Sequence, residues 1–396
     1  MHETNDMLRK TIMGSAMAAA LILPALADKP ADSRQAEKAE LGRALFFDPS
    51  LSSPPGQSCA TCHDANAAFT DPDRSLPVSK GVLPGRVGNR NTPTAMYAAF
   101  SPDFHFDKEE GLYVGGQFLD GRAATLEEQA KGPLLNPLEM ANPDKQSVVD
   151  KVRRAAYSQT FDKVFGQGAL DDTEQAYERI AEALAALERT PQFSPFSSKY
   201  DAWLAGKAKL TPQELRGLRL FEAEDKGNCA ACHTSKPGPK GEPPLFTDFT
   251  YDNLGVPRNP DNPFYKLPTQ LNSAGVAWID RGLGATVNKP SEDGKFKVPT
   301  LRNIELTAPY MHNGYFKSLR GTVVFYNDRD KKPRCSQDLV TEEAALKQKC
   351  WPAPEVNANV NDEELGNLGL TEREIDDIVA FMKTLNDGWQ AMKGNR

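Results

Sequence analysis

The chain contains Cys59-Ala60-Thr61-Cys62-His63 and Cys229-Ala230-Ala231-Cys232-His233, two copies of the pattern Cys-x-x-Cys-His. Two thiols three residues apart on one turn can each form a thioether with a haem vinyl group, and the adjacent histidine can then bind the iron. Zinc ribbons and thioredoxin-like redox sites also use Cys-x-x-Cys pairs, but here each pair carries the trailing histidine. The motifs predict two covalent c-type haems, with attachment points and proximal ligands at Cys59, Cys62 and His63 and at Cys229, Cys232 and His233.

The sequence around the two motifs is duplicated. Gly42-Arg43-Ala44-Leu45-Phe46 precedes the first motif, and Gly217-Leu218-Arg219-Leu220-Phe221 precedes the second. Phe69-Thr70-Asp71 and Phe246-Thr247-Asp248 follow them in the same way. Such a repeat indicates two related units, each with a leading helix, a haem motif and a following loop. This layout is typical of class I cytochrome c domains.

Helix signals favour a mainly α fold built from two such domains. Thr211 and Thr371 each open a capping box with Glu three residues later, and residues 172–189 place apolar side chains at helical spacing. We expect the helix after Thr371 to be ended by Gly388. The N-terminal domain is expected over residues 28–205 and the C-terminal domain over 206–396, with the boundary between residues 195 and 208.

Residues 1–27 are typical of a bacterial secretory signal peptide. Arg9 and Lys10 precede a mostly apolar run, and Ala25-Leu26-Ala27 forms a small-x-small cleavage site. The run is too short to span a bilayer of roughly 30 Å. We therefore expect cleavage near Ala27, a periplasmic location and no stable membrane insertion.

Charge and composition exclude several classes of protein. Lys and Arg total 47 against 54 Asp and Glu, so the net charge of −7 argues against nucleic-acid binding, which needs a basic surface. A hydrophobic content of 39% excludes a disordered chain.

Cys335 and Cys350 remain outside the motifs, and in an oxidising compartment a disulfide between them would stabilise the fold by about 3 kcal/mol.

Two exported c-type haems fit three function classes: an electron-transfer cytochrome, a peroxidase that couples the haems, or a sulfur oxidoreductase. Axial ligands discriminate between them, because a haem with two strong ligands transfers electrons whereas an open face can bind peroxide. Apart from the motif histidines, the chain has His2, His105 and His312. A bis-histidine haem would therefore need His105 or His312, since His2 lies in the signal peptide.

Residues 40–385 resemble the bacterial di-haem cytochrome c peroxidases, and within them the MauG subgroup of methylamine utilisation. The matching words follow the family order along nearly the whole mature chain. They are SCATCH at residues 58–63, RNTPT at 90–94, GGQF at 115–118, DGR at 120–122, LNPLEM at 135–140, FSPF at 193–196, SKY at 198–200 and PYMHNG at 309–314.

The resemblance implies different roles for the two haems. The haem on His63 would react with peroxide, and the haem on His233 would transfer electrons. Tyr326, fourteen residues after His312, would be the second axial ligand of the latter, where classical members have Met. A phenolate ligand favours ferric and higher iron states, although a core aromatic is the alternative role for Tyr326. Residues 77–89, which in classical members include a closing histidine, contain no His or Met, so we expect an open peroxide site.

The resemblance also implies residues around the first haem. Gln129, Pro133 and Glu139 match the family's distal pocket, and Glu139 is the expected acid-base group for O–O cleavage. A calcium ion between the haems would be bound by the Asn91 side chain and the backbone carbonyls of Thr307 and Pro309.

Two positions depart from the MauG pattern. Leu119 replaces a tryptophan that carries charge between the haems, and Gly227 replaces a tryptophan near the docked protein substrate. We therefore expect reduction of hydrogen peroxide to water, with a small cytochrome c or copper protein as the electron donor. The alternatives are a MauG-like oxidase that modifies side chains of a partner protein, and a non-enzymatic di-haem electron carrier.

Overall fold

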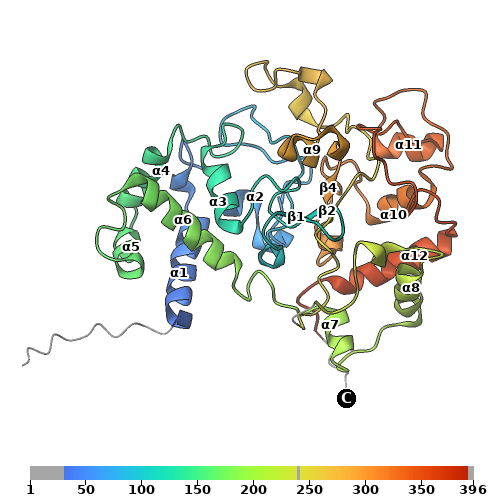
Figure 1. Cartoon of the computed structure of the whole chain (residues 1–396), viewed down its shortest axis with the longest axis horizontal. Helices are drawn as coiled ribbons and strands as arrows, with labels where there is room; N and C mark the ends of the chain where they lie inside the picture. The colour runs from blue at the N-terminus through green and yellow to red at the C-terminus, as the bar shows by residue number, and fades with distance from the viewer. Residues whose placement is uncertain (1–30, 239–240, 391–396) are drawn as a thin grey trace, which may run out of the picture.

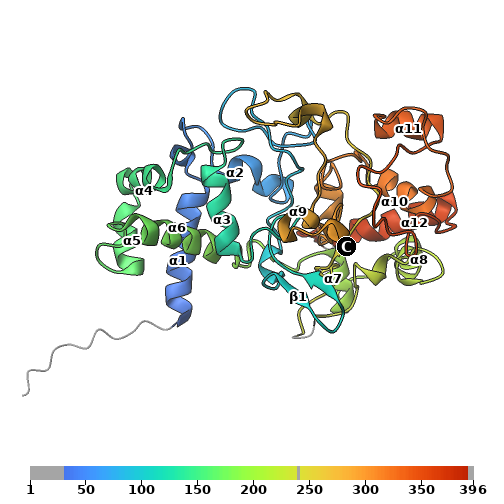
Figure 2. The same cartoon turned by 45° about the horizontal axis from the view of Figure 1, so that its top comes forward.

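Two helical lobes lie side by side along the long axis of the molecule (Figures 1 and 2). The structure is a computed structural model that describes residues 31–238 and 241–390, so the predicted signal peptide at 1–27 lies outside the described residues. The prediction of a mainly α fold is confirmed. The helices are α1 (Ala31–Phe46), α2 (Cys59–Cys62), α3 (Leu126–Leu135), α4 (Lys145–Arg154), α5 (Ser158–Phe165), α6 (Thr173–Glu188), α7 (Lys199–Leu204), α8 (Pro212–Glu222), α9 (Leu283–Val287), α10 (Leu319–Asp328), α11 (Glu342–Gln348) and α12 (Glu372–Met382).

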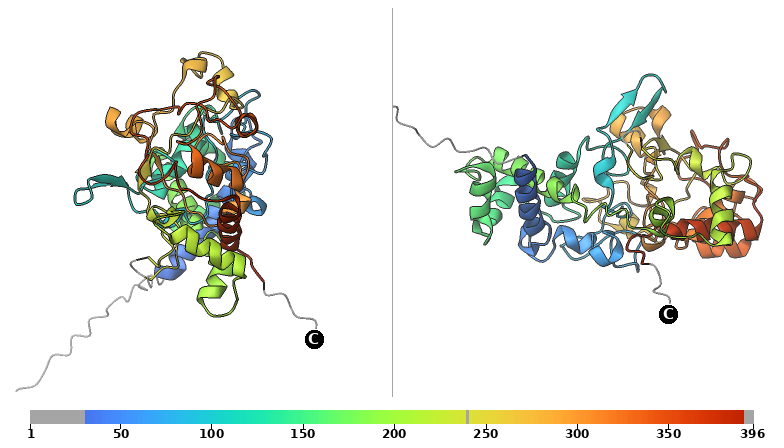
Figure 3. Two further views of the ribbon diagram at one scale, coloured as in Figure 1. Left: turned by 90° about the vertical axis from the view of Figure 1, so that its right-hand side faces the viewer. Right: turned by 90° about the horizontal axis from the view of Figure 1, so that it is seen from below.

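Strands are few and short. β1 (His105–Asp107) pairs antiparallel with β2 (Leu112–Val114), and β3 (Tyr251–Asp252) pairs antiparallel with β4 (Phe296–Lys297). The β1–β2 hairpin projects from the body of the molecule (Figure 3). Among the described residues, no helix is long and apolar enough to cross a membrane.

The helix starts lie where the two capping boxes and the apolar spacing of residues 172–189 predict them. Asp172, Thr211 and Thr371 are the N-caps of α6, α8 and α12, and each side chain accepts a hydrogen bond from a backbone N–H in the first turn. The predicted end of the last helix at Gly388 is wrong. α12 ends at Met382, and a 3-10 turn follows over Lys383–Leu385. Beyond this turn the Asp387 N–H donates to the Asn303 side chain at 2.8 Å, which draws the chain away from the helix axis.

The duplicated sequence forms the same helix crossing in each lobe. α1 packs on α6, and α8 packs on α12. A Cβ atom at Gly42 of α1 would lie 1.9 Å from the carbonyl oxygen of Ala183, and one at Gly217 of α8 would lie 1.9 Å from that of Asp377. Both crossings therefore require glycine, because the backbones approach too closely for any side chain.

Each lobe has its own hydrophobic core. The N-terminal core draws on residues 41–193, and the C-terminal core on residues 200–385. A third, small cluster combines Val78 and Val87 with Phe264 and Leu267, so it joins segments from the two halves of the chain. Residues 195–208, where we expect the domain boundary, contain α7. The division into two domains stays a prediction.

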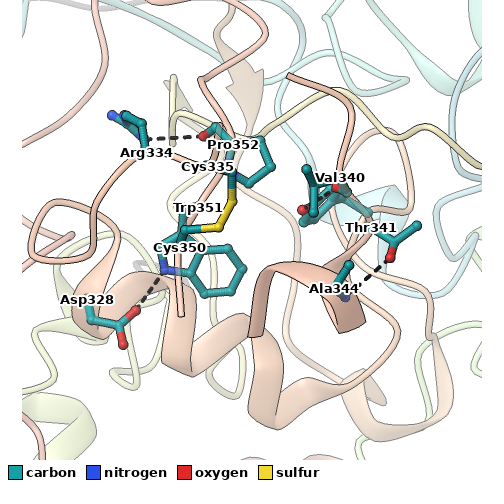
Figure 4. Close-up of a disulfide and its surroundings, with 10 residues drawn as sticks. Asp328, Arg334, Cys335, Val340, Thr341, Ala344, Cys350, Trp351 and Pro352 are labelled. Atoms are coloured by element: carbon teal, nitrogen blue, oxygen red, sulfur yellow. Dashed lines mark hydrogen bonds between the residues drawn. A yellow bond between two sulfur atoms is a disulfide. The ribbon is translucent and has the colours of Figure 1, made fainter. Parts of the chain in front are cut away.

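The C-terminal lobe contains a disulfide between Cys335 and Cys350 (Figure 4). It closes the segment that includes α11 beside the fully buried Trp351. The Trp351 indole N–H donates to the Asp328 carboxylate at the end of α10 at 2.8 Å. The disulfide and this hydrogen bond together fix the segment against α10, the helix that carries Tyr326.

The helix crossing predicts the effect of Gly217→Ala. Alanine normally stabilises a helix interior by about 0.5–1 kcal/mol relative to glycine. Here the new methyl group overlaps the Asp377 carbonyl, so we expect a loss of about 1–3 kcal/mol in the free energy of unfolding. Urea unfolding of the haem-loaded protein measures it. Gly88→Ala is the control, because the atoms nearest its added Cβ lie 3.7 Å away, and an equal effect in both variants would contradict the crossing.

Candidate functional site

Both motif histidines are oriented by the same hydrogen bond. His63 Nδ1 lies 2.9 Å from the carbonyl oxygen of Phe69, and His233 Nδ1 lies 2.9 Å from that of Phe246. Both phenylalanines have a left-handed backbone, with φ of 53° and 54°. With Nδ1 engaged, Nε2 of each ring is the nitrogen left to bind iron. Burial lowers the pKa of both imidazoles, which favours the neutral, metal-binding form.

The four motif cysteines are free thiols on single turns. Cys59 and Cys62 begin and end α2, whereas Cys229 opens the 3-10 turn Cys229–Ala231. Two unpaired thiols beside an oriented imidazole, repeated twice, are the donor set that a covalent c-type haem requires. The residues present therefore fit two such haems.

A cavity of about 290 Å³, which we call the C-terminal cavity, is lined by Cys229, Cys232 and His233. Tyr326 on α10 lines it as well. The neighbouring Phe325 points instead into the core, with its ring centroid 4.9 Å from Phe316 and 5.1 Å from Trp351.

The Tyr326 hydroxyl forms no hydrogen bond with any residue in the described ranges 31–238 and 241–390. Burial, with smaller effects from the Cys229 and Cys232 sulfurs, raises the pKa of its phenol. Tyr326 thus presents an unpaired oxygen to the cavity that holds His233.

The two other histidines considered as ligands are placed differently. His312 lines the C-terminal cavity, but its ring stacks on Phe296 at 3.7 Å between centroids, and its Nε2 lies 3.4 Å from the Glu355 carboxylate. His105 lies exposed on the projecting β1–β2 hairpin. The geometry therefore leaves Tyr326, rather than His105, beside the C-terminal motif.

A second cavity, of about 520 Å³, which we call the distal cavity, lies along α3. Pro133 of α3 and Glu139 line it, as expected, whereas Gln129 is half-buried and is not among its lining residues. The other lining residues are Phe118, Arg122, Ala123, Ala124, Glu128, Gly132 and Asn136. Among these described residues no His, Met, Cys or Lys side chain faces the distal cavity.

Glu139 is the half-buried acid of the distal cavity. Its Oε1 accepts a hydrogen bond from the Asn136 amide at 2.8 Å. Burial raises the pKa of its carboxyl, and the positive charge of Arg122 opposes that shift. Burial raises the pKa of the Cys59 and Cys62 thiols to about 12, with a smaller contribution from the Glu139 charge, so this carboxyl lies within electrostatic reach of the first motif.

Leu119 and Gly227, the two departures from the MauG pattern, both line the C-terminal cavity. Phe118, next to Leu119, lines both cavities, so this loop separates them. A Cβ atom at Gly227 would lie 2.3 Å from the Leu220 carbonyl oxygen. A larger residue at 227 would therefore need a different backbone path.

Asn91 comes together with Thr307 and Pro309, although it lies more than 200 residues before them in the sequence. All three line one small cavity of about 10 Å³. The Asn91 side-chain amide donates to the Pro77 carbonyl at 3.0 Å, which leaves its oxygen for another partner. An amide oxygen and nearby backbone carbonyls are hard donors that suit calcium.

Two site residues were missed in the sequence, although both lie in words that carried the resemblance. Arg122 ends the DGR word, and Asn136 belongs to the LNPLEM word. Their placement in the distal cavity depends on how the loop at 115–122 folds over α3, which no local pattern encodes.

Comparisons with known proteins agree with this geometry. A family model described as di-haem cytochrome c peroxidase matches residues 36–209. The methylamine utilization protein MauG of Paracoccus denitrificans is 42% identical over 93% of this chain and 93% of its own length. The cytochrome c551 peroxidase of Nitrosomonas europaea is 34% identical over 74% of each chain.

A solved structure shares the fold. The crystal structure of the diheme peroxidase BthA from Burkholderia thailandensis superposes with a TM-score of 0.73 and 35% identity, over 89% of this chain and 86% of that one. The oriented histidines on paired Cys-x-x-Cys-His turns and these full-length similarities lead to one conclusion: the chain belongs to the di-haem cytochrome c peroxidase family.

Proposed function

We propose that this protein is a periplasmic di-haem c-type peroxidase that reduces hydrogen peroxide to water. The observation that carries the proposal is the distal cavity, which the half-buried Glu139 lines within electrostatic reach of Cys59 and Cys62. Each haem, when bound, supplies an iron that exchanges electrons. Two electrons and two protons convert one peroxide molecule into two water molecules. An external donor would supply the electrons, and His233 would hold the haem that exchanges them.

The chain's own residues handle the protons. Burial keeps the Glu139 carboxyl protonated to a higher pH than usual, so it can give a proton to the leaving oxygen of peroxide. The carboxylate that results can then take the proton from the other peroxide oxygen. Asn136 orients this carboxyl through the hydrogen bond at 2.8 Å. Pro133 forms part of the apolar wall that limits entry of water. Gln129 lies on the same helix but does not line the cavity, so we assign it no direct contact with peroxide.

Tyr326 is proposed to bind the iron of the C-terminal haem together with His233, since both residues line the same cavity. Its hydroxyl is unpaired within the described residues and lies in the cavity that holds the second motif. A phenolate donor stabilises ferric iron. The two haems, one in each proposed cytochrome c-like domain (28–205 and 206–396), would then differ in ligation and in role.

A calcium ion is proposed at Asn91, Thr307 and Pro309. The free Asn91 side-chain oxygen and the carbonyl-bearing segment at 307–309 support it. Bound there, the ion would tie the segment after the first motif to the loop before α10.

The electron donor is proposed to be a small cytochrome c or a copper protein. The second candidate is a MauG-like oxidase that modifies a partner protein, because a 42% identical relative is named MauG. Leu119 and Gly227 favour the peroxidase, since an aliphatic side chain and a glycine offer no oxidisable ring for charge transfer. A non-enzymatic electron carrier is disfavoured by the absence of a strong iron ligand among the described residues lining the distal cavity.

Low-temperature EPR of the fully ferric, haem-loaded protein tests the proposal. One high-spin and one low-spin signal are expected, because His63 alone would bind the first iron while His233 and Tyr326 bind the second. Two low-spin signals would show that another ligand closes the first haem, and the chain would then be a gated peroxidase or an electron carrier.

Glu139→Gln tests the acid-base role. Glutamine keeps the size of the side chain and removes the transferable proton, so we expect the reaction with peroxide to slow by about 10²-fold. Stopped-flow absorption of the haems measures this rate. Glu178→Gln is the matched control, because Glu178 is an exposed glutamate that pairs with Lys131 in the same lobe. Equal rates in the two variants would remove Glu139 from the mechanism.

Tyr326→His tests the axial ligand. Replacing a phenolate with an imidazole should give a conventional low-spin haem whose ferrous state is reached at a higher potential. Spectroelectrochemical titration of the C-terminal haem measures the shift, and the high-spin EPR signal of the other haem should stay unchanged. An unaltered spectrum and potential would mean that Tyr326 is a packing residue and that the ligand lies elsewhere.

A further inference from the structure

Arg122 forms the charged side of the distal cavity. Its guanidinium carbon lies 3.5 Å from the centroid of the Phe118 ring, and both residues line the cavity with Glu139. The side chain is 43% exposed, so it reaches from the cavity to solvent. An arginine stays charged at every accessible pH, and stacking on an aromatic face fixes its orientation.

The loop that presents Arg122 is held in an unusual conformation. Gly116, Phe118 and Gly121 all have positive φ, with 61° at Phe118. Phenylalanine rarely adopts this conformation, which marks a position that the surrounding structure imposes. The tip of the Phe118 ring lies against Gly132 of α3, where an added Cβ would be 3.2 Å from Cζ of the ring. Phe118 is thus confined between α3 and the arginine.

A buried ion-pair network holds Arg122 from behind. Its Nη1 donates to Asp120 at 2.8 Å, and Asp120 also accepts from Arg90 at 2.7 Å. Arg90 in turn pairs with Asp280 of the C-terminal half at 2.6 Å. The side chains of Asp120 and Asp280 are 7% and 3% exposed, so water does not compete for these contacts.

The other charged residues that line the distal cavity are Glu128 and Glu139. Glu128, at the rim, pairs with Lys131 at 2.7 Å. Glu139 is the remaining carboxyl that lines the cavity, and burial favours its neutral form. Asn136 contributes an amide. Asp120, which pairs with Arg122, does not itself line the cavity. Among the described residues that line it, Arg122 is therefore the positively charged one beside Glu139.

We propose that the distal cavity is a binding site for a small monoanion, held between the Arg122 guanidinium and the Glu139 carboxyl. The class includes hydroperoxide, the conjugate base of the substrate, together with azide and fluoride. The inference rests on the proposed function, because it takes this cavity to be the face of the first haem at which peroxide reacts. Arg122 is then a specificity-determining residue, and Asp120 and Arg90 are positioning residues.

The test compares anion and neutral-ligand binding in the haem-loaded ferric protein. Azide and fluoride are titrated against the optical spectrum, with imidazole as a neutral probe. Arg122→Gln should weaken both anions by roughly ten- to a hundredfold, because a hydrogen bond to a charged group is lost, while imidazole affinity stays within twofold. Arg122→Lys should restore part of the anion affinity, since it restores the charge but not the planar fork.

Arg189→Gln is the matched control. Arg189 has a 40% exposed side chain, pairs with Glu127 at 2.6 Å in the same lobe and does not line the distal cavity. It should leave all three affinities unchanged. The proposal is overturned if Arg122→Gln behaves like this control, or if it weakens azide and imidazole equally, which would indicate a general disturbance of the pocket.

Failure of the inference can be told apart from failure of the proposed function. If Glu139→Gln slows peroxide reduction but Arg122→Gln leaves azide and fluoride binding intact, only the anion site is refuted. If neither anion perturbs the spectrum of the unsubstituted protein, the anion site is refuted as well. The peroxide rate of Glu139→Gln then decides whether the distal cavity is the reactive face.

Discussion

The fold depends on a helix crossing so close that the residue at its centre can have no side chain. Gly42 allows α1 to lie against α6, and Gly217 allows α8 to lie against α12. The leading helix of each pair has a phenylalanine in its last turn. The ring centroid of Phe46 lies 6.1 Å from that of Phe69, and the ring centroid of Phe221 lies 6.1 Å from that of Phe246. The carbonyls of Phe69 and Phe246 orient the motif histidines. A backbone approach thus determines which way each iron-binding nitrogen faces.

The two lobes share this arrangement but differ in the cavity beside it. In the C-terminal lobe, α10 brings an unpaired phenol into the space around His233. In the N-terminal lobe the space contains a half-buried carboxyl and an arginine, and no described lining residue is a strong iron ligand. We propose that one repeated unit thereby yields one site for electron transfer and one for a small substrate. The ion pairs from Asp120 through Arg90 to Asp280 connect the second site to the opposite half of the chain.

The residues between the cavities bear on the choice between peroxidase and protein-modifying oxidase. Leu119 occupies the loop that separates them, so charge must pass between the haems without an aromatic ring at that position. Gly227 lies where the Leu220 carbonyl leaves no room for a side chain. Both features are compatible with electrons arriving from a small donor. They give no support to oxidation of a large docked protein through surface tryptophan.

The sequence by itself determined the duplicated helical units and the helix starts at Asp172, Thr211 and Thr371, and it predicted the haem attachment points, because each depends on residues close together in the chain. It also indicated Glu139 and Pro133, through words shared with a family. Only the tertiary structure placed Arg122 over Phe118, left Gln129 outside the lining of the distal cavity and ended α12 at Met382. These outcomes depend on contacts such as Asp120 with Arg90 and Asn303 with Asp387, which join residues far apart in sequence and leave no local pattern.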